Sequence, residues 1–320
     1  MAGELRRLRV KRVSYEADNI NSYELVAPEG GDLVPFTAGS HIDLHLQNGM
    51  IRSYSLVNDQ RESHRYVIAV NKDASGRGGS SFVHDTIRPG DIVMVSAPRN
   101  NFVLREKAEF SVLIAGGIGI TPLLSMIHRL EALIRPWKLF YAARTRQAAA
   151  FLDDLEAIRP DVHLNLRLDF DDERAGRMFD IAGIVADAPE LAHLYCCGPL
   201  PMLEAFEKAA AGRPADRIHV EYFHARQAPA TSGGFEVRLA RSNRTIAVKS
   251  GKTILDALLD AGVLANHSCS EGVCGTCETR VIEGIPDHRD LFLSPEERAA
   301  NKTIMICCSG SKSETLVLDL

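Results

Sequence analysis

The first third of the chain carries short runs in which apolar and polar residues alternate. These runs cover Tyr23–Ala27, His41–Leu46, Arg52–Val57, Arg65–Val70 and Asp91–Ser96. Turn signals such as Asn48-Gly49 and Pro89-Gly90 separate them. Short strands at this spacing are typical of an antiparallel barrel, which we expect over residues 1–105.

The hydrophobic pattern changes after residue 105. The apolar run Ser111–Ala115 predicts a buried strand, and a glycine-rich turn follows it. From Pro122 to Leu133 the apolar residues recur at helical spacing, and Pro122 suits the first turn of a helix. Further strands are predicted at Lys138–Ala142, His163–Leu168 and Leu194–Cys197. Alternating strands and helices predict an α/β domain with a parallel sheet over residues 106–226.

A segment of linker composition follows this domain. Residues 225–234 are small, polar and rich in proline and glycine, and we place the linker itself at 227–234. After it, Phe235–Leu239 and Arg244–Val248 predict a hairpin, and Thr253–Ala261 predicts a helix. These elements predict a small α+β unit over residues 235–320, so the chain is expected to be multidomain.

Composition and charge narrow the functional classes. Hydrophobic residues make up 45% of the 320 residues and charged residues 25%, as is ordinary for globular protein. The net charge of −5, without a polybasic tail, argues against nucleic acid as a partner. The N-terminus lacks the apolar stretch of a signal peptide, and no apolar run approaches the roughly 20 residues that span a bilayer. We therefore expect a soluble cytoplasmic protein with no membrane or nucleic-acid partner.

Four late cysteines carry the strongest chemical signal. They follow the plant-type spacing of [2Fe–2S] ligands, C-x₄-C-x₂-C and then a distant fourth: Cys269, Cys274, Cys277 and Cys307. Gly272 and Gly275 lie inside this loop, where small residues let backbone N–H groups approach the sulfurs. The loop therefore predicts a [2Fe–2S] cluster.

Two other readings of these cysteines stay open. The thiols can be free and buried, or they can bind zinc, although zinc sites usually show two close cysteine pairs and here the fourth ligand stands alone. Spacing alone also leaves Cys308 as a rival to Cys307 for the fourth ligand. We assign Cys307, because the plant-type pattern places the ligand before a residue that need only be small or apolar.

Two segments of the first domain predict a flavin site. Arg52-Ser53-Tyr54-Ser55 offers a fixed cation for a phosphate, a ring to pack on an isoalloxazine, and a hydroxyl near its reactive atom. Gly76–Ser80 is rich in glycine, and its exposed N–H groups can form an anion site. Taken singly, the first segment also suits an ordinary surface strand, and the second suits a flexible loop.

The turn Gly116–Pro122 predicts a nicotinamide nucleotide site in the α/β domain. It joins a strand to a helix, whose N-terminal N–H groups can hold a pyrophosphate. Its third glycine position is Pro122, which departs from the G-x-G-x-x-G pattern. Cys197-Gly198-Pro199 ends a later strand and can place a thiol near the nicotinamide, although a core cysteine before a turn fits equally.

Charges near the expected adenosine end point in two directions. The acidic run Asp169–Glu173 follows a strand, and acidic residues beside the ribose disfavour the 2′-phosphate of NADPH. Arg144 and Arg146 favour that phosphate. We expect NADH.

Together and in this order, these segments resemble the phthalate dioxygenase reductase family of the ferredoxin–NADP reductase superfamily. The resemblance covers essentially the whole chain. It rests on Arg52–Ser55, Gly76–Ser80, Gly116–Pro122, Cys197–Pro199, Glu221–Phe223 and the four-cysteine loop. It implies an antiparallel flavin-binding β-barrel, an α/β nucleotide-binding domain and a C-terminal β-grasp plant-type ferredoxin domain. The position of the ferredoxin domain at the end implies FMN rather than FAD. Vanillate demethylase and carnitine monooxygenase reductases are similar as well.

The resemblance also implies roles for single residues. Ser55 and Cys197 are expected beside the hydride path as the catalytic residues, and Phe223 against the flavin ring. The full set of cofactor-binding candidates is Arg52, Ser53, Tyr54, Ser55, Ala69, Val70, Gly78, Gly79, Ser80, Gly117, Thr121, Cys197, Gly198 and Phe223. One departure is Gly310, which stands where many relatives carry an arginine after the fourth cluster cysteine.

The expected function is an NADH-dependent iron–sulfur flavoprotein reductase. Electrons would pass from NADH to FMN, then to the [2Fe–2S] cluster, then to a partner oxygenase of the Rieske type. The chain lacks the paired C-x-H and C-x₂-H motifs of a Rieske centre, so oxygen chemistry belongs to the partner. A monomer suffices for this path. The alternatives are an electron carrier or redox sensor with a degenerate flavin site, and a reductase that releases free reduced flavin.

Overall fold

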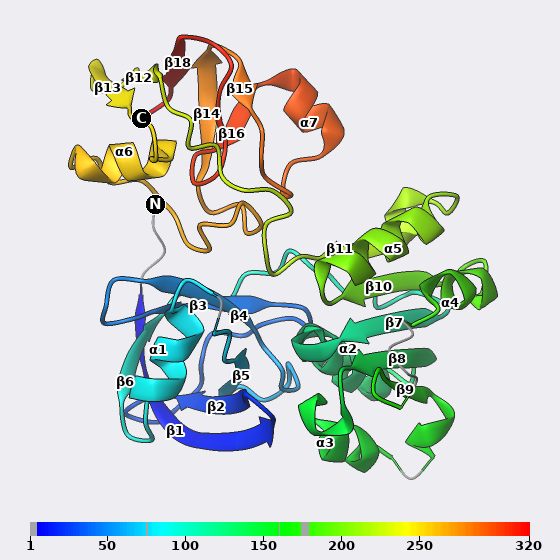
Figure 1. The fold of residues 1–320 in the computed structure, drawn as a ribbon. Coiled ribbons are helices and arrows are strands. Elements are labelled where there is room, and N and C mark those ends of the chain that lie inside the picture. The colour runs from blue at the N-terminus through cyan, green and yellow to red at the C-terminus, as the bar shows by residue number, and fades with distance from the viewer. Residues whose placement is uncertain (1–4, 75, 160, 174–178) are drawn as a thin grey trace. The chain divides into compact units, whose positions relative to one another are not determined.

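The computed structural model describes residues 5–74, 76–159, 161–173 and 179–320. The chain divides into two compact units, Gly3–Glu221 and Tyr222–Leu320, and each is described by itself (Figure 1). Within the described residues, no helix is long and apolar enough to cross a bilayer.

The first unit begins with a curled six-stranded antiparallel sheet in the order β4-β3-β6-β1-β2-β5. Its strands are β1 (Arg6–Ala17), β2 (Ile20–Val26), β3 (His41–His45), β4 (Ile51–Ser55), β5 (Tyr66–Asn71) and β6 (Ile92–Val95). A bridge between Leu56 and Ile68 joins the chain after β4 to β5 and brings the ends of the sheet together. The helix α1 (Gly79–Thr86) lies against β5. The predicted antiparallel barrel is confirmed.

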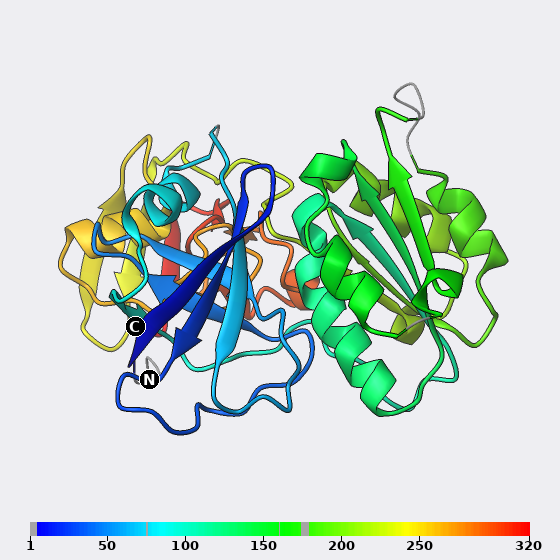
Figure 2. The same cartoon turned by 90° about the horizontal axis from the view of Figure 1, so that it is seen from below.

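The same unit continues with a five-stranded parallel sheet in the order β11-β10-β7-β8-β9, labelled in Figure 1 and seen in green beside its helices in Figure 2. Its strands are β7 (Ser111–Gly116), β8 (Trp137–Ala143), β9 (Leu166–Phe170), β10 (His193–Cys197) and β11 (Ile218–Glu221). Its helices are α2 (Ile120–Ala132), α3 (Leu152–Ala157), α4 (Ile181–Asp187) and α5 (Leu200–Ala210). Short 3₁₀ turns lie at Gly117–Gly119, Arg146–Ala148, Val162–Leu164 and Ala215–Arg217. Because the sheet is parallel, the loops after its strands gather at one edge.

One predicted strand of this sheet starts too early. His163 and Leu164 belong to a 3₁₀ turn, in which the N–H of Leu164 donates to Asp161 and that of Asn165 donates to Val162. Leu164 is exposed, so its apolar character signals no buried position. The strand itself runs from Leu166 to Phe170.

The second unit carries a mixed five-stranded sheet in the order β13-β12-β18-β14-β16 and a two-stranded pair, β15 and β17. Its strands are β12 (Phe235–Leu239), β13 (Arg244–Val248), β14 (Glu278–Glu283), β15 (Pro286–Asp287), β16 (Thr303–Met305), β17 (Gly310–Ser311) and β18 (Thr315–Leu318). Its helices are α6 (Ile254–Asp260) and α7 (Pro295–Ala300). Thr253 and Asp256 form a capping box that starts α6 where the sequence predicts it. The predicted hairpin and β-grasp arrangement are present.

The segment of linker composition is hydrogen-bonded to the second unit. The N–H of Ala230 donates to the carbonyl of Cys308 at 2.7 Å, and Gly251 donates to Thr231 at 2.8 Å. The N–H of Ala225 donates to the Glu271 carboxylate at 3.1 Å. Much of this segment is therefore anchored beside the cluster loop.

Candidate functional site

The four predicted cluster cysteines lie together in the second unit as two contacting pairs. Cys269 contacts Cys274, and Cys277 contacts Cys307 through their side chains. All four are buried. A [2Fe–2S] cluster needs two thiolates on each of two irons, and this pairing supplies them.

The same pairing does not suit a single metal ion. A zinc ion needs three or four protein ligands that converge on one point. The geometry therefore favours the di-iron reading over the zinc site that the sequence left open.

Hydrogen bonds to sulfur favour thiolates in this loop. The N–H of Glu271 donates to the Cys269 sulfur at 3.3 Å, and the N–H of Gly272 donates to Cys307. Hydrogen bonds from Cys277 and then Cys308 lower the pKa of Cys307, while the Cys307 sulfur raises the pKa of Cys277. A hydrogen bond from Cys269 likewise lowers the pKa of Cys274, so one cysteine of each pair ionises more readily than a free thiol, and an iron cation would complete the ionisation of the other.

Close packing explains both glycines of the cluster loop. Gly272 has φ +72°, and a Cβ there would lie 2.4 Å from the Cys308 sulfur. Gly275 has φ +78°, and a Cβ there would lie 2.4 Å from the ring of Phe292. Cys308 is fully buried beneath the loop, with its sulfur 3.8 Å from the carbonyl of Met305. Cys307, which contacts Cys277, is therefore the better fourth ligand.

Arg52 lies against the N-terminus of α1 in the first unit, where β4 meets this helix. The guanidinium of Arg52 donates to the carbonyl of Arg77 at 3.3 Å. A Cβ on Gly79 would lie 2.3 Å from Arg52 Nε, so the helix starts directly against the arginine. Gly78 adopts φ +79° at the N-cap. A guanidinium beside a helix N-terminus is a combination that binds phosphate.

The other flavin candidates have different surroundings. Ser53 donates to Asp43 at 2.8 Å within the barrel, and the hydroxyl of Ser80 accepts the N–H of Asp73 at 3.0 Å. Tyr54 is half-buried, and burial raises its pKa. Two further candidates lie buried on β5, namely Ala69 and Val70. Although β4 and β5 end the strand order at opposite sides, the closed sheet brings them into contact. The predicted flavin residues on these two strands therefore lie in one region of the barrel.

The nucleotide candidates gather at the carboxyl edge of the parallel sheet. A Cβ on Gly119 would lie 2.1 Å from the carbonyl oxygen of Cys197, and one on Gly116 would lie 2.6 Å from Pro199. The turn after β7 therefore lies directly against the end of β10. Thr121 is buried in the first turn of α2, where its hydroxyl donates to the carbonyl of Ile118 at 3.0 Å.

Ser55 at the end of β4 meets Glu221 at the end of β11, beside Cys197. Cys197 and Glu221 are register partners on β10 and β11, and Ser55 hydrogen-bonds to the Glu221 carboxylate. The Glu221 residue is partly exposed, but its Oε2 atom is buried without a partner. Burial raises the pKa of Glu221 to about 8 and that of Cys197 well above its usual range. At neutral pH both groups therefore hold their protons.

Two of the curated relatives match almost the full length. The phenoxybenzoate dioxygenase subunit beta of Ectopseudomonas oleovorans is 55% identical over 313 residues, which cover 98% of this chain and 97% of that protein. The phthalate dioxygenase reductase of Burkholderia cepacia is 40% identical over 318 residues, with 98% and 97% coverage. The chain belongs to the phthalate dioxygenase reductase family.

Domain families and solved structures agree with this membership. The oxidoreductase NAD-binding domain matches residues 113–208, and the 2Fe-2S iron-sulfur cluster binding domain matches residues 237–311. A solved phthalate dioxygenase reductase, described as modular for electron transfer from pyridine nucleotides to [2Fe-2S], has a TM-score of 0.79 at 38% identity. It covers 99% of this chain and 98% of its own. An intact type IV self-sufficient cytochrome P450 monooxygenase has a TM-score of 0.83 at 37% identity, and 41% of that chain is covered.

The family membership confirms the central sequence predictions. The fold class, the oxidoreductase activity and the electron path from pyridine nucleotide through flavin to a [2Fe–2S] cluster are as expected. The cofactor set of FMN, NADH and [2Fe–2S] is that of the phthalate dioxygenase reductase family. The roles of individual site residues and the domain boundaries stay predictions.

Sequence reasoning missed the contact between Glu221 and Ser55. It noted the run Glu221–Phe223 as a motif and gave a role only to Phe223. Phe223 lies in the second unit, whereas Glu221 ends the first and contacts Ser55. Glu221 ends the half-buried strand β11, and no local pattern marks its contact with Ser55, which lies 166 residues earlier in the chain.

Removing the Arg52 side chain is expected to weaken FMN binding. Each charge-assisted hydrogen bond contributes about 1.5–3 kcal/mol, so Arg52→Ala should raise the Kd for FMN by about tenfold to a hundredfold. Gly79→Ala should do the same by displacing the guanidinium. Fluorescence titration of the flavin-free protein with FMN measures both. Arg12→Ala removes an exposed arginine from the same barrel and should leave the Kd unchanged; equal effects of Arg52→Ala and Arg12→Ala would refute the phosphate assignment.

Proposed function

We propose that this protein oxidises NADH at a barrel-bound FMN and passes electrons singly, through its [2Fe–2S] cluster, to a Rieske-type oxygenase. The proposal rests first on the four cysteines of the second unit, which lie as two contacting pairs. In the first unit it rests on Arg52 beside the N-terminus of α1 and on the contact between Ser55 and Glu221. A flavin accepts a hydride and releases its electrons one at a time, which a one-electron cluster requires.

The chain's own residues bind and orient these groups. Arg52 and the N-terminus of α1 hold the FMN phosphate, with Ser53, Tyr54, Ala69, Val70 and Gly78–Ser80 around the flavin. The turn Gly117–Thr121, Cys197 and Gly198 hold the nicotinamide end of NADH. Ser55 and Cys197 lie beside the hydride path. Cys269, Cys274, Cys277 and Cys307 hold the cluster.

We assign these tasks to successive parts of the chain. Residues 1–105 form the FMN domain, 106–226 the NADH domain, 227–234 the linker and 235–320 the ferredoxin domain. Within the linker, the N–H of Ala230 donates to Cys308 and the carbonyl of Thr231 accepts the N–H of Gly251, so this part of the linker is anchored to the second unit. A monomer contains the whole path.

The preference for NADH rests on the residues after β8 and β9. Asp169 is buried at the end of β9, and Asp171 follows it. The guanidinium of Arg146 lies 4.7 Å from the ring centre of Phe170. This cation–π contact engages one of the two arginines that would otherwise favour the 2′-phosphate of NADPH. Acidic groups near the ribose repel a 2′-phosphate.

We expect kcat/KM for NADH to exceed that for NADPH by about tenfold or more, equivalent to about 1.4 kcal/mol. Asp171→Asn should narrow this ratio by removing a negative charge. Asp187→Asn, an exposed change at the end of α4, should leave the ratio as it is. Steady-state kinetics with both nucleotides tests this; equal kcat/KM values in the unmodified protein would contradict it.

The Rieske type of the partner is supported by relatives named as dioxygenase components. Two other acceptors have specific support. A structural match is fused to a cytochrome P450, and a relative from Sphingobium chlorophenolicum, 48% identical, is named tetrachlorobenzoquinone reductase. Electron transfer from NADH through the purified protein to a Rieske oxygenase, a P450 and a benzoquinone separates the three. Faster reduction of the P450 or the quinone than of the Rieske protein would overturn the proposed acceptor.

A further inference from the structure

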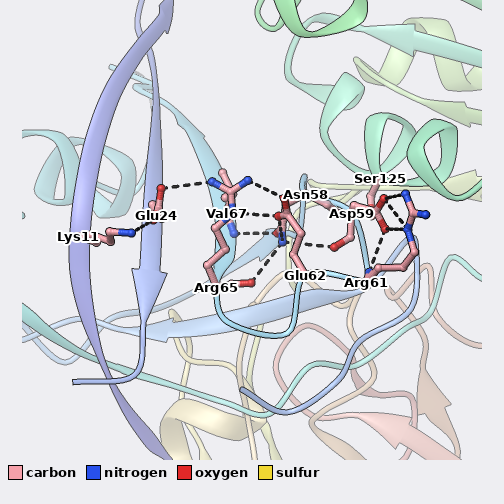
Figure 3. Close-up of polar contacts among 9 residues, drawn as sticks. All are labelled: Lys11, Glu24, Asn58, Asp59, Arg61, Glu62, Arg65, Val67 and Ser125. Atoms are coloured by element: carbon pink, nitrogen blue, oxygen red, sulfur yellow. Dashed lines mark hydrogen bonds and ion pairs between the residues drawn. The ribbon is translucent and has the colours of Figure 1, made fainter. Parts of the chain in front are cut away.

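The loop that joins β4 to β5 is braced by one buried amide. Asn58 is 6% exposed, and its side-chain Nδ2 donates to Glu62 Oε2 at 3.0 Å and to the carbonyl of Arg65 at 3.2 Å (Figure 3). Its Oδ1 accepts the N–H of Val67 at 2.9 Å. Asn58 therefore ties residues 58–65, here called the Asn58 loop, to the start of β5.

The backbone of Asn58 reaches across to the nucleotide domain. Its carbonyl accepts a hydrogen bond from the hydroxyl of Ser125 at 3.0 Å, and Ser125 is fully buried on α2 (Figure 3). Asn58 stands three residues after Ser55, and Ser125 stands four residues after Thr121. This single bond thus connects the strand of the predicted flavin residues to the helix that begins at the nicotinamide turn.

A chain of ion pairs stiffens the barrel side of this connection. Glu24 on β2 has a buried side chain that pairs with Lys11 at 3.0 Å and with Arg65 at 3.3 Å. Arg65 also pairs with Glu62 at 2.8 Å. Because Glu62 in turn accepts the amide of Asn58, the loop is held from the barrel side by partly buried charges.

Hydride transfer is unusually sensitive to such a connection. The nicotinamide C4 that donates the hydride and the flavin N5 that accepts it must approach to about 3–3.5 Å, and a misplacement of about 1 Å can cost a hundredfold in rate. These two atoms would be held by different domains, the barrel and the parallel sheet. A contact that sets the spacing of these domains therefore sets the reaction distance without touching either cofactor.

We propose that Asn58 and Ser125 are positioning residues for hydride transfer, which hold the nicotinamide turn at a fixed distance from the flavin strand. The inference rests on the proposed function, since it presupposes that NADH and flavin react at this junction. It adds two residues that bind neither cofactor to those that determine the rate.

Single-turnover reduction of the flavin by NADH tests the proposal in Asn58→Ala and Ser125→Ala. The dependence on NADH concentration separates the limiting rate from the Kd. We expect the limiting rate to fall about tenfold to a hundredfold, with the Kd for NADH little changed. The isotope effect with NADH deuterated at C4 should rise, because hydride transfer becomes more fully rate-limiting. Arg61→Ala is the control, because Arg61 lies on the same loop with a 64% exposed side chain paired to Asp59.

Three results would overturn the inference. One is a limiting rate and isotope effect like those of the unmodified protein in both variants. Another is a slower rate that matches a loss of bound flavin, with the isotope effect unchanged, since that marks only structural damage. The third is an equal loss in Arg61→Ala. Ser125→Ala deletes a single oxygen, so it decides the matter if Asn58→Ala does not fold. If the unmodified protein does not react with NADH, the result contradicts the proposed function itself rather than the role of Asn58 and Ser125.

Discussion

Replacing Cys307 with alanine is expected to abolish the [2Fe–2S] cluster, whereas the same change at the adjacent Cys308 should leave it in place. Cys307 contacts Cys277 and receives the N–H of Gly272, as a cluster ligand would. Cys308 points beneath the loop, next to Gly272 and the carbonyl of Met305. Losing one of four thiolates leaves an iron without its ligand, whereas losing Cys308 removes only a buried side chain.

Visible absorption and the paramagnetic signal of the reduced protein measure this difference. In Cys307→Ala both should vanish, and electron transfer from NADH to cytochrome c should fall to the level of protein stripped of iron. Reduction of ferricyanide, which can take electrons from the flavin, should persist in both variants and shows that the first unit is intact. A cluster that survives in Cys307→Ala and disappears in Cys308→Ala would reverse the assignment.

Ser55→Ala and Glu221→Gln are expected to slow flavin reduction by NADH, each in its own way. Ser55→Ala removes the hydroxyl that contacts Glu221, and we expect a fall of about tenfold to a hundredfold in the limiting rate. Glu221→Gln keeps a neutral side chain of the same shape, so near neutral pH its loss should be smaller. The main effect of Glu221→Gln should appear in the pH profile.

The sign of that profile follows from burial. Burial raises the pKa of Glu221 to about 8, so the folded protein holds this proton where an unfolded chain would have released it. As the pH rises through about 8, the carboxylate becomes charged beside a site that receives a hydride, and the rate should fall. Ionisation should also reduce stability progressively from the ordinary glutamate range up to about 8. Glu221→Gln should flatten both dependences; a rate profile that is unchanged in Glu221→Gln would exclude Glu221 as its source.

The sequence pattern was sufficient to predict those elements whose structure depends on residues close together in the chain. The apolar run Ser111–Ala115 and the following turn predicted β7 and α2, because burial and helix geometry act within a few residues. The cluster loop could be predicted for the same reason, because three of its four cysteine ligands lie within nine residues. The packing of Gly272 and Gly275 shows why these positions carry glycine.

Elements whose signals depend on distant parts of the chain were missed. β1 was not predicted as a strand. Its exposed face is rich in arginine and lysine, and these charged residues outnumber the alternating apolar residues Leu8 and Val10. α1 begins at glycines and read as a loop, because it is stabilised by lying against β5 and Arg52. No local pattern links Asn58 to Ser125, since they are 67 residues apart and meet only in the folded unit.

Anaerobic addition of NADH to the purified protein tests the central claim most directly. The account predicts that flavin absorbance bleaches and that the paramagnetic signal of a reduced [2Fe–2S] cluster appears, with no other reductant or protein present. Bleaching of the flavin without any cluster signal, in protein whose iron content is complete, would contradict an electron path that runs from nicotinamide through flavin to the four cysteines.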